Sequence, residues 1–327
     1  MRALPEFTLH RPDSLAEAVA LGGAAGTRLL AGGTDLLPNL RRGLEQPQAL
    51  VDLSQLGELR LLEQAADGSL AIGAGVTLAT LASDPLVART LPALAEAARA
   101  VAANTHRTSA TLGGNLCQDT RCVFYNQSEW WRATNGYCLK RNGTRCHVAP
   151  QGERCHAAFC SDIAPVLLVA GAEVQLASAS GTRTLPLAQL YRDDGAAHLA
   201  LQPGELLVRV RIPPAVVGER IAFAKTRVRG GVDFPLASAA VALRLHEGRI
   251  ASLRAALSGT NSLPLLIEGT AALEGCTVDE ASAKTLRQLV QKQVQPMRST
   301  VTPPQYRREA AGVLAGRLLR SLALQDG

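Results

Sequence analysis

Apolar and polar positions along the first two thirds of the chain alternate in ways that predict short strands and helices in turn. Ser14 and Glu17 form a capping-box pair before an alanine-rich amphipathic stretch, which predicts a helix there. Further elements are predicted as short strands at 49–53 and 69–72, two helices within 78–103, a strand region at 164–176 and a hairpin at 182–187.

The last third of the chain has the pattern of an antiparallel sheet followed by helices. Glu247-Gly248 and Gly230-Gly231 are turn signals between apolar runs, which predict three strands at 221–228, 232–245 and 249–257. Two helices follow, since apolar residues recur at helical spacing. The expected apolar faces are Leu286, Leu289, Val290 and Val294 for the first helix, and Tyr306, Ala310, Val313, Leu314 and Leu318 for the second.

These elements predict an α+β protein of two domains. A larger domain of mixed elements spans 1–217, and a smaller domain with a three-stranded antiparallel sheet covered by helices spans 218–327. One segment, 117–160, does not fit the pattern, because it shows neither helical nor strand period over a useful length. It holds six of the seven cysteines and both tryptophans. Such a long loop inside a domain is expected to be functional, and we interpret it as an insertion.

Composition narrows the class of protein. Hydrophobic residues make up 47% and charged residues 19% of the 327 residues, which excludes a disordered chain. No apolar run is long enough to cross a membrane, and the start of the chain lacks a secretory pattern, so we expect a cytoplasmic protein with reduced thiols. The net charge of +6 is scattered, which predicts a solvated surface and no nucleic-acid partner.

Two paired-glycine loops are candidates for phosphate binding. The first lies in LLAGGTDLLP at 29–38, and the second is TLGGN at 111–115. Glycines let backbone N–H groups approach an anion, and two such loops could hold the two phosphates of a dinucleotide. Each loop alone could equally be an ordinary turn, and neither is the Rossmann fingerprint. Asp162 could accept hydrogen bonds from sugar hydroxyls or could cap a helix.

Four cysteines of the insertion are candidates for metal binding: Cys122, Cys138, Cys146 and Cys155, separated by fifteen, seven and eight residues. Four thiolates suit a 4Fe-4S cluster or a structural zinc ion, although the spacing matches neither common pattern. His147 and His156 could be ligands, but we expect loop histidines. Disulfides are disfavoured by the compartment. The chemistry of the cysteine set favours a metal or cluster over unbound thiols.

Taken in order, the motifs resemble the flavoprotein subunit of the molybdenum hydroxylase (xanthine dehydrogenase) family. They are AGGTDLL at 31–37, IGAGVTL at 72–78, TLGGN at 111–115, SDIAP at 161–165, PGELL at 203–207, residues 225–234 and YRR at 306–308. The resemblance implies a two-subdomain FAD-binding domain of the molybdopterin-dehydrogenase (PCMH) type, completed by the carboxy-terminal domain. The FAD contacts it implies are Leu29, Leu30, Ala31, Gly32, Gly33, Thr34, Asp35, Leu36, Val76, Thr77, Thr111, Leu112, Gly113, Gly114, Asn115, Gln118, Asp162, Leu207 and Lys225.

The insertion resembles that of 4-hydroxybenzoyl-CoA reductase β subunits, in CQDTRCVFYNQSEWWR and GYCLK. This resemblance implies a 4Fe-4S cluster on Cys122, Cys138, Cys146 and Cys155, with Cys117 and Cys160 free, although the spacing would also allow Cys160 in place of Cys155. It implies electrons passing from reduced ferredoxin through the cluster and FAD to a 2Fe-2S small subunit and a molybdenum large subunit, in a dimer of heterotrimers. No catalytic residue is then expected in this chain.

Three alternatives remain open from the sequence. The chain could be the FAD subunit of an oxidative molybdenum hydroxylase that delivers electrons to NAD or a quinone. It could serve another reductive enzyme such as a 6-hydroxynicotinate reductase. It could also be a zinc-stapled interaction protein whose paired glycines are only turns.

Overall fold

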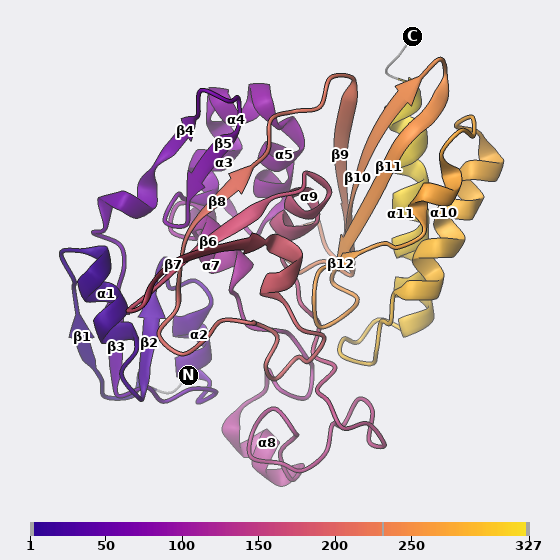
Figure 1. The fold of residues 1–327 in the computed structure, drawn as a ribbon. Helices are drawn as coiled ribbons and strands as arrows, with labels where there is room; N and C mark the ends of the chain where they lie inside the picture. The colour runs from indigo at the N-terminus through magenta and orange to yellow at the C-terminus, as the bar shows by residue number, and fades with distance from the viewer. Residues whose placement is uncertain (1–2, 231, 325–327) are drawn as a thin grey trace.

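Three β-sheets organise the computed structural model, which describes residues 3–230 and 232–324 (Figure 1). Two sheets belong to the amino-terminal region and the third to the carboxy-terminal region, so the α+β fold class is confirmed. Of the predicted Gly230-Gly231 turn, Gly231 lies outside the described residues. Within the described ranges, no helix has both the length and the apolar character needed to cross a membrane.

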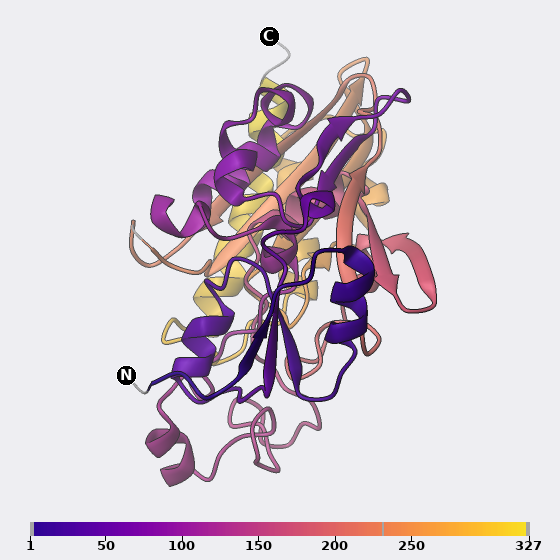
Figure 2. The same cartoon turned by 90° about the vertical axis from the view of Figure 1, so that its left-hand side faces the viewer.

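A small parallel sheet forms the first subdomain, at the front of Figure 2. Its strands stand in the order β1-β3-β2, and both outer strands pair in parallel with β3. Parallel neighbours need a crossover connection, which α2 supplies between β2 and β3. Ser14 caps α1 by accepting a hydrogen bond from the Glu17 N–H at 3.2 Å, as predicted. The elements are β1 (Thr8–His10), α1 (Leu15–Gly22), β2 (Thr27–Leu30), α2 (Leu36–Arg41) and β3 (Ala49–Asp52).

An antiparallel sheet of five strands, in the order β4-β5-β8-β6-β7, forms the second subdomain. Its first two strands precede the cysteine-rich insertion and its other three follow it. The strand predicted at 69–72 and the hairpin that includes 182–187 are both confirmed. The strands are β4 (Leu62–Gln64), β5 (Leu70–Gly73), β6 (Glu173–Ser178), β7 (Gly181–Pro186) and β8 (Leu206–Ile212).

Residues 78–103, predicted to form two helices, form three, so that prediction is wrong in number. The Asp84 carboxylate accepts hydrogen bonds from the N–H groups of Leu86 and Val87 at 2.8 and 3.1 Å, which starts a new helix. Pro92 then occupies the first position of the third, where its missing N–H costs nothing. The helices are α3 (Leu78–Ser83), α4 (Pro85–Thr90) and α5 (Pro92–Ala100), followed by the short α6 (Asn104–Arg107) and α7 (Leu112–Leu116).

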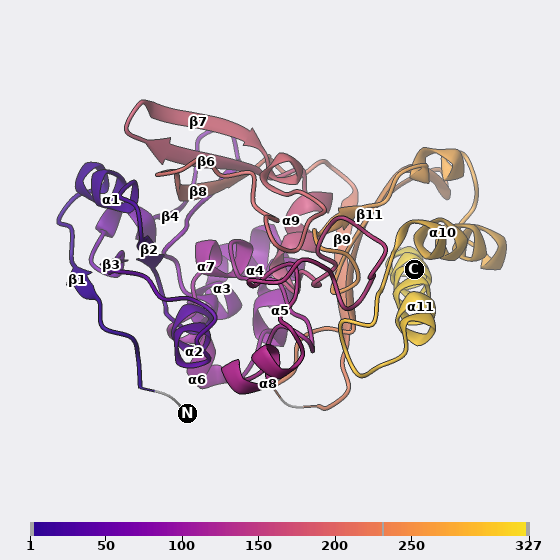
Figure 3. The ribbon, with the colours of Figure 1, turned by 90° about the horizontal axis from the view of Figure 1, so that it is seen from below.

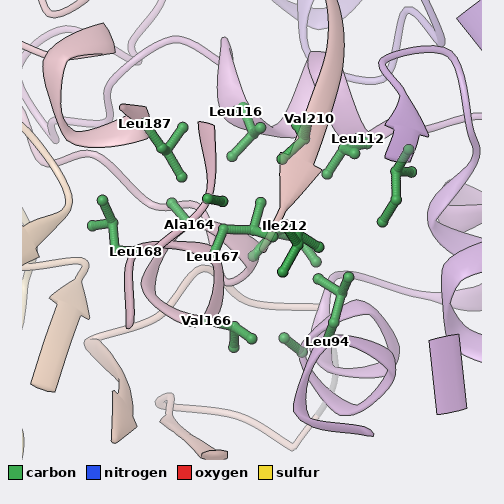
Figure 4. Close-up of a cluster of buried hydrophobic side chains, with 14 of the residues drawn as sticks. Leu94, Leu112, Leu116, Ala164, Val166, Leu167, Leu168, Leu187, Val210 and Ile212 are labelled. Carbon is green, nitrogen blue, oxygen red and sulfur yellow. The ribbon is translucent and has the colours of Figure 1, made fainter. Parts of the chain in front are cut away.

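The strand region predicted from residue 164 begins instead as a helix, α9 (Ile163–Val169), ahead of β6. All seven of its residues are buried. A helix that is apolar on every side has no polar stripe, so its sequence cannot be told from a buried strand by periodicity. Figure 4 shows α9 in the central core with neighbours from α5, α7, β8 and the segment after β7. The labelled residues are Leu94, Leu112, Leu116, Ala164, Val166, Leu167, Leu168, Leu187, Val210 and Ile212.

The carboxy-terminal sheet has four antiparallel strands rather than the three predicted. The extra strand has only two residues, too few to show an alternating pattern. Strand β10 (Ala237–His246) of this sheet is buried on both faces. Ala240 and Ala242 join the central core, while Val241 and Leu243 face the helices. The small alanines let the two domains approach closely. The strands are β9 (Glu219–Thr226), β10 (Ala237–His246), β11 (Arg249–Ser258) and β12 (Leu265–Leu266).

Helices α10 (Glu280–Gln293) and α11 (Pro304–Ala323) cover the outer face of this sheet (Figure 1). The predicted apolar face of α10 is largely confirmed. The face predicted for α11 is wrong, because only Leu318 of its five residues is buried. Small residues make the real contact: a Cβ on Gly312 would lie 3.0 Å from the Arg287 carbonyl oxygen of α10. The buried residues of α11 are Arg307, Ala311, Gly312, Ala315, Gly316, Leu318, Leu319 and Leu322.

The insertion extends below the rest of the molecule in Figure 1 and lies toward the viewer in Figure 3. It is mostly irregular, as predicted, apart from the short helix α8 (Glu129–Thr134), which is capped by Ser128. It packs around a small hydrophobic core, to which Leu44 from the segment after α2 also contributes. The residues of that core are Leu44, Cys122, Tyr125, Cys138, Cys155 and Ala157.

Candidate functional site

The first Gly-Gly loop, residues 31–35, joins β2 to α2. Gly32 packs against the backbone of Ser109, where a Cβ would lie 1.8 Å from the carbonyl oxygen, and Gly33 has a φ of +70°. Both positions therefore require glycine. Among the described residues, no acceptor is found for the N–H groups of Gly32, Gly33 and Thr34. Free N–H groups on a half-buried loop are suited to an anion such as a phosphate.

The second Gly-Gly loop, residues 111–115, pairs with the segment that follows β5. The N–H of Leu112 donates to Val76 O at 2.9 Å, and the N–H of Gly113 donates to Ala74 O at 2.8 Å. Thr111 caps α7 by accepting from the Gly114 N–H at 3.1 Å. The structure therefore brings the motifs at 72–78 and 111–115 side by side.

The two loops also meet each other. A Cβ on Gly114 would lie 3.9 Å from the Ala31 Cβ, and Gly32 contacts the residues just before the second loop. Three segments that are far apart in the sequence thus converge on one half-buried surface. A dinucleotide that spans both loops would meet glycine backbone on each side.

Some of the predicted FAD contacts have structural tasks in the fold. Leu29 packs against the position of Gly22 at the end of α1, and the Thr77 hydroxyl caps α3 by accepting from the Thr80 N–H at 3.1 Å. Leu207 is 3% exposed and lies beneath Gly113 in the central core. The Leu207 side chain therefore packs against the second Gly-Gly loop.

Asp162 and Lys225 form a buried ion pair between the two domains. Lys225 Nζ lies 2.6 Å from Asp162 Oδ2, and both side chains are at most 5% exposed. Burial raises the pKa of Asp162 to about 6, while the Lys225 charge opposes that shift. Asp162 makes no helix-capping hydrogen bond, so the capping alternative is wrong. Ser161, its neighbour, donates to Asn115 Oδ1 at 2.6 Å and so ties this pair to the second loop.

Gln118 lies just after the second loop and is 8% exposed. Its carbonyl oxygen is bonded to His198 Nε2 at 2.9 Å. Its side-chain Nε2 is buried and has no hydrogen-bond partner within the described part of the chain. An unsatisfied buried donor is costly, so this amide is suited to an acceptor from a bound ligand.

The four cysteines predicted as ligands line one cavity in the insertion. Cys122, Cys138, Cys146 and Cys155 are each 5–8% exposed, and all four border the same space. Burial raises the pKa of Cys122 to about 11 and that of Cys155 to about 12. Such thiols ionise readily only with a metal, whose binding releases their protons. Cys160 lies outside this cavity, so the structure favours Cys155 over Cys160 as the fourth ligand.

The described part of the chain has no ready-made site for a single metal ion. Two thiolates on a tetrahedral zinc are no more than roughly 4 Å apart, since Zn–S is ≈ 2.3 Å. Within the described residues, no group of three or more His, Cys, Asp or Glu side chains is placed to hold a metal ion. The Ala157 N–H donates to Cys155 Sγ at 3.4 Å, the kind of bond that tunes cluster sulfurs. His147 borders the cavity but is bonded to Tyr137 O and stacked on Phe124.

Ion pairs join the cavity to the first Gly-Gly loop. Arg121, which precedes Cys122, pairs with the Asp35 carboxylate. The Asp119 N–H donates to Asp35 Oδ2 at 2.9 Å, and Lys140 Nζ lies 2.5 Å from Asp119 Oδ1. Sequence reasoning assigned no role to Arg121, Asp119 or Lys140. In the sequence, the only signal was that these residues stand close to a candidate ligand cysteine or to the second Gly-Gly loop. Their ion pairs could not be predicted, because the partners are up to 86 residues away.

The fold and the two Gly-Gly loops suit a dinucleotide-binding protein, and comparison with known families defines the class as FAD-binding proteins. Residues 5–215 match the FAD binding domain in molybdopterin dehydrogenase, and residues 222–322 match the CO dehydrogenase flavoprotein C-terminal domain. The chain belongs to this family, the FAD-binding subunits of the molybdenum hydroxylases. It is therefore an FAD-binding subunit of an oxidoreductase.

Individual relatives extend over most of the chain. The aldehyde oxidoreductase FAD-binding subunit PaoB of Escherichia coli K12 is 36% identical over 80% of this chain and 84% of its own length. The carbon monoxide dehydrogenase medium chain of Afipia carboxidovorans is 29% identical over 95% of this chain and 94% of its own.

Solved structures share the fold. The crystal structure of the cyanide-inactivated Cu,Mo-CO dehydrogenase has a chain that superposes with a TM-score of 0.81 at 27% identity, covering 99% of this chain and 100% of its own. Quinoline 2-oxidoreductase from Pseudomonas putida 86 gives 0.78 at 26% identity and 99% of both chains.

Proposed function

We propose that this chain carries FAD on its two Gly-Gly loops and a 4Fe-4S cluster on Cys122, Cys138, Cys146 and Cys155, as the electron-transfer subunit of a molybdenum enzyme. The observation that carries the proposal is the common cavity of these four thiols, joined by ion pairs to the first Gly-Gly loop. When bound, the two cofactors would supply one-electron transfer through the subunit.

The residues of the chain have separate tasks in this proposal. The N–H groups of the first loop would hold the pyrophosphate. Residues 111–115 of the second loop, whose N–H groups from Leu112 to Asn115 are bonded within the protein, would line it. Asp162, Gln118 and Lys225 would accept or donate hydrogen bonds at the ribityl and flavin end, with the remaining predicted contacts lining the site. The Tyr125 and Phe124 rings, which border the cysteine cavity, would exclude water. No general acid or base is assigned to this chain.

Two directions of electron flow are candidates. The 36% identity to an aldehyde oxidoreductase subunit favours an oxidative enzyme, in which electrons leave through this chain to an acceptor such as NAD or a quinone. The motifs of the insertion favour instead a reductive enzyme of the 4-hydroxybenzoyl-CoA reductase type, or a 6-hydroxynicotinate reductase, fed by ferredoxin. In both, the partners would be a molybdenum large subunit and a 2Fe-2S small subunit, and we expect the complex in the cytoplasm.

Replacing one ligand tests the cluster. In the complex purified without oxygen, Cys138→Ser should lose about four iron atoms per chain. It should keep its flavin, because the contacts of the Gly-Gly loops with each other and with the segment after β5 involve no cysteine. Cys276→Ser, at an exposed cysteine, is the matched control and should keep both. Unchanged iron in Cys138→Ser, or a colourless wild-type protein that contains zinc, would refute the proposal.

Turnover assays separate the directions. Oxidation of an aromatic aldehyde with a dye as acceptor supports the oxidative candidate. Reduction of 4-hydroxybenzoyl-CoA with a low-potential donor, without aldehyde oxidation, supports the reductive one.

A further inference from the structure

Lys140 places a buried positive charge at the wall of the cysteine cavity. Lys140 lines the cavity together with the four cysteines, and its side chain is 6% exposed. Nζ lies 2.5 Å from both Asp119 Oδ1 and Thr120 Oγ1, and 3.3 Å from Thr120 O. An ammonium has three N–H donors. All three are thus directed to oxygen atoms, so the charge acts on the cavity through space and not by a bond to sulfur.

The surroundings make this charge effective. The Lys140 ammonium lies 4.3 Å from the centre of the Tyr125 ring, which also borders the cavity and keeps water away. Asp119, the counter-charge, is not one of the residues that line the cavity.

We propose that Lys140 raises the reduction potential of the cluster bound in this cavity and that Asp119 limits the increase. The inference rests on the proposed function, because it assumes a cluster on the four cysteines. Uptake of one electron makes a site that already holds four thiolates more negative, while no bond forms or breaks. A cation in a water-poor environment stabilises that added charge, and an anion destabilises it.

Redox titration of the intact complex, followed by the low-temperature EPR signal of the cluster, tests this. Lys140→Gln removes the cation and should lower the midpoint potential. Asp119→Asn removes the anion but keeps an oxygen for Lys140, and should raise it. Lys140→Arg keeps the charge and should restore a potential near that of the wild type. Lys284→Gln removes an exposed lysine of α10 and is the matched control, with no expected shift.

The opposite signs separate electrostatics from damage to the fold. A general loosening of the insertion would shift both variants in the same direction, and that result, like two unchanged potentials, would overturn the inference while leaving the cluster in place. If Lys140→Gln does not retain iron, Asp119→Asn and Lys140→Arg still decide: a potential that does not rise in Asp119→Asn overturns the inference. A wild-type complex without a cluster signal from this chain would instead refute the proposed function.

Discussion

At the scale of single residues, the two glycines of the first loop are required for different reasons. Gly33 needs a left-handed conformation, and Gly32 needs space against Ser109. The sequence predicted that these glycines matter, but it offered two reasons, turn geometry or ligand approach. The structure adds a third, since Gly32 is where two loops of one proposed site touch.

Gly32→Ala should therefore disturb the meeting of the two loops. Forcing a methyl group into this contact should destabilise the protein by about 1–3 kcal/mol and reduce the FAD retained on purification. Flavin absorbance per chain and urea unfolding measure the two effects. Gly57→Ala is the control, because no atom lies within 4 Å of its Cβ position, and it should change stability by less than about 0.5 kcal/mol. Equal flavin content in both variants would contradict this reading.

At the scale of elements, α11 shows how a buried polar residue can fix a helix. Arg307 is fully buried, and its guanidinium donates to the carbonyl oxygens of Leu236, Met297 and Gly259. Leu236 directly precedes β10, Gly259 directly follows β11, and Met297 lies in the segment that leads to α11. One side chain thus joins three separate segments. The apolar periodicity of α11 pointed to another face because it gave no weight to an arginine or to glycines.

Arg307→Ala should destabilise the protein by about 3–5 kcal/mol, because it leaves buried carbonyl groups without donors. The free energy of unfolding in urea measures the loss. Arg308→Ala changes the exposed neighbour on the same helix and should have an effect within about 0.5 kcal/mol. Similar effects of the two substitutions would show that the hydrogen bonds of Arg307 contribute little.

At the scale of the whole molecule, two buried groups give stability an opposed dependence on pH. Burial lowers the pKa of His198 from 6.5 to about 4, so the unfolded chain takes up this proton first and acid removes stability between these values. Burial raises the pKa of Asp162 to about 6, so the folded chain takes up that proton first and acid adds stability between about 6 and 3.8.

His198→Gln removes only the first effect and keeps a donor for Gln118 O. Between pH 7.5 and 5, the variant should lose about 2 kcal/mol less stability than the wild type, as follows from the His198 shift. Urea unfolding at the two pH values measures the difference. His246→Gln, at an exposed histidine, should behave like the wild type. Parallel losses in all three proteins would mean that His198 is not buried in its neutral form.

The sequence by itself determined the class of fold, the two Gly-Gly loops and the cysteines of the insertion, because these depend on residue type and local spacing. Glycine is the residue favoured where φ is positive, and the affinity of a thiol for soft metals is a property of the residue type. It did not determine the third helix in 78–103 or α9, since short or wholly buried elements lack a period.

Tertiary structure alone decided which residues meet. It placed Cys155 rather than Cys160 at the cavity. It also paired Asp162 with Lys225, and it linked Asp35 to Asp119 and Asp119 to Lys140. All of these residues are distant in sequence from their partners. Such contacts follow from how the sheets and helices pack, and local patterns carry no information about them. The charge beside the cysteine cavity, on which the tuning of its cofactor is proposed to depend, belongs to this second kind.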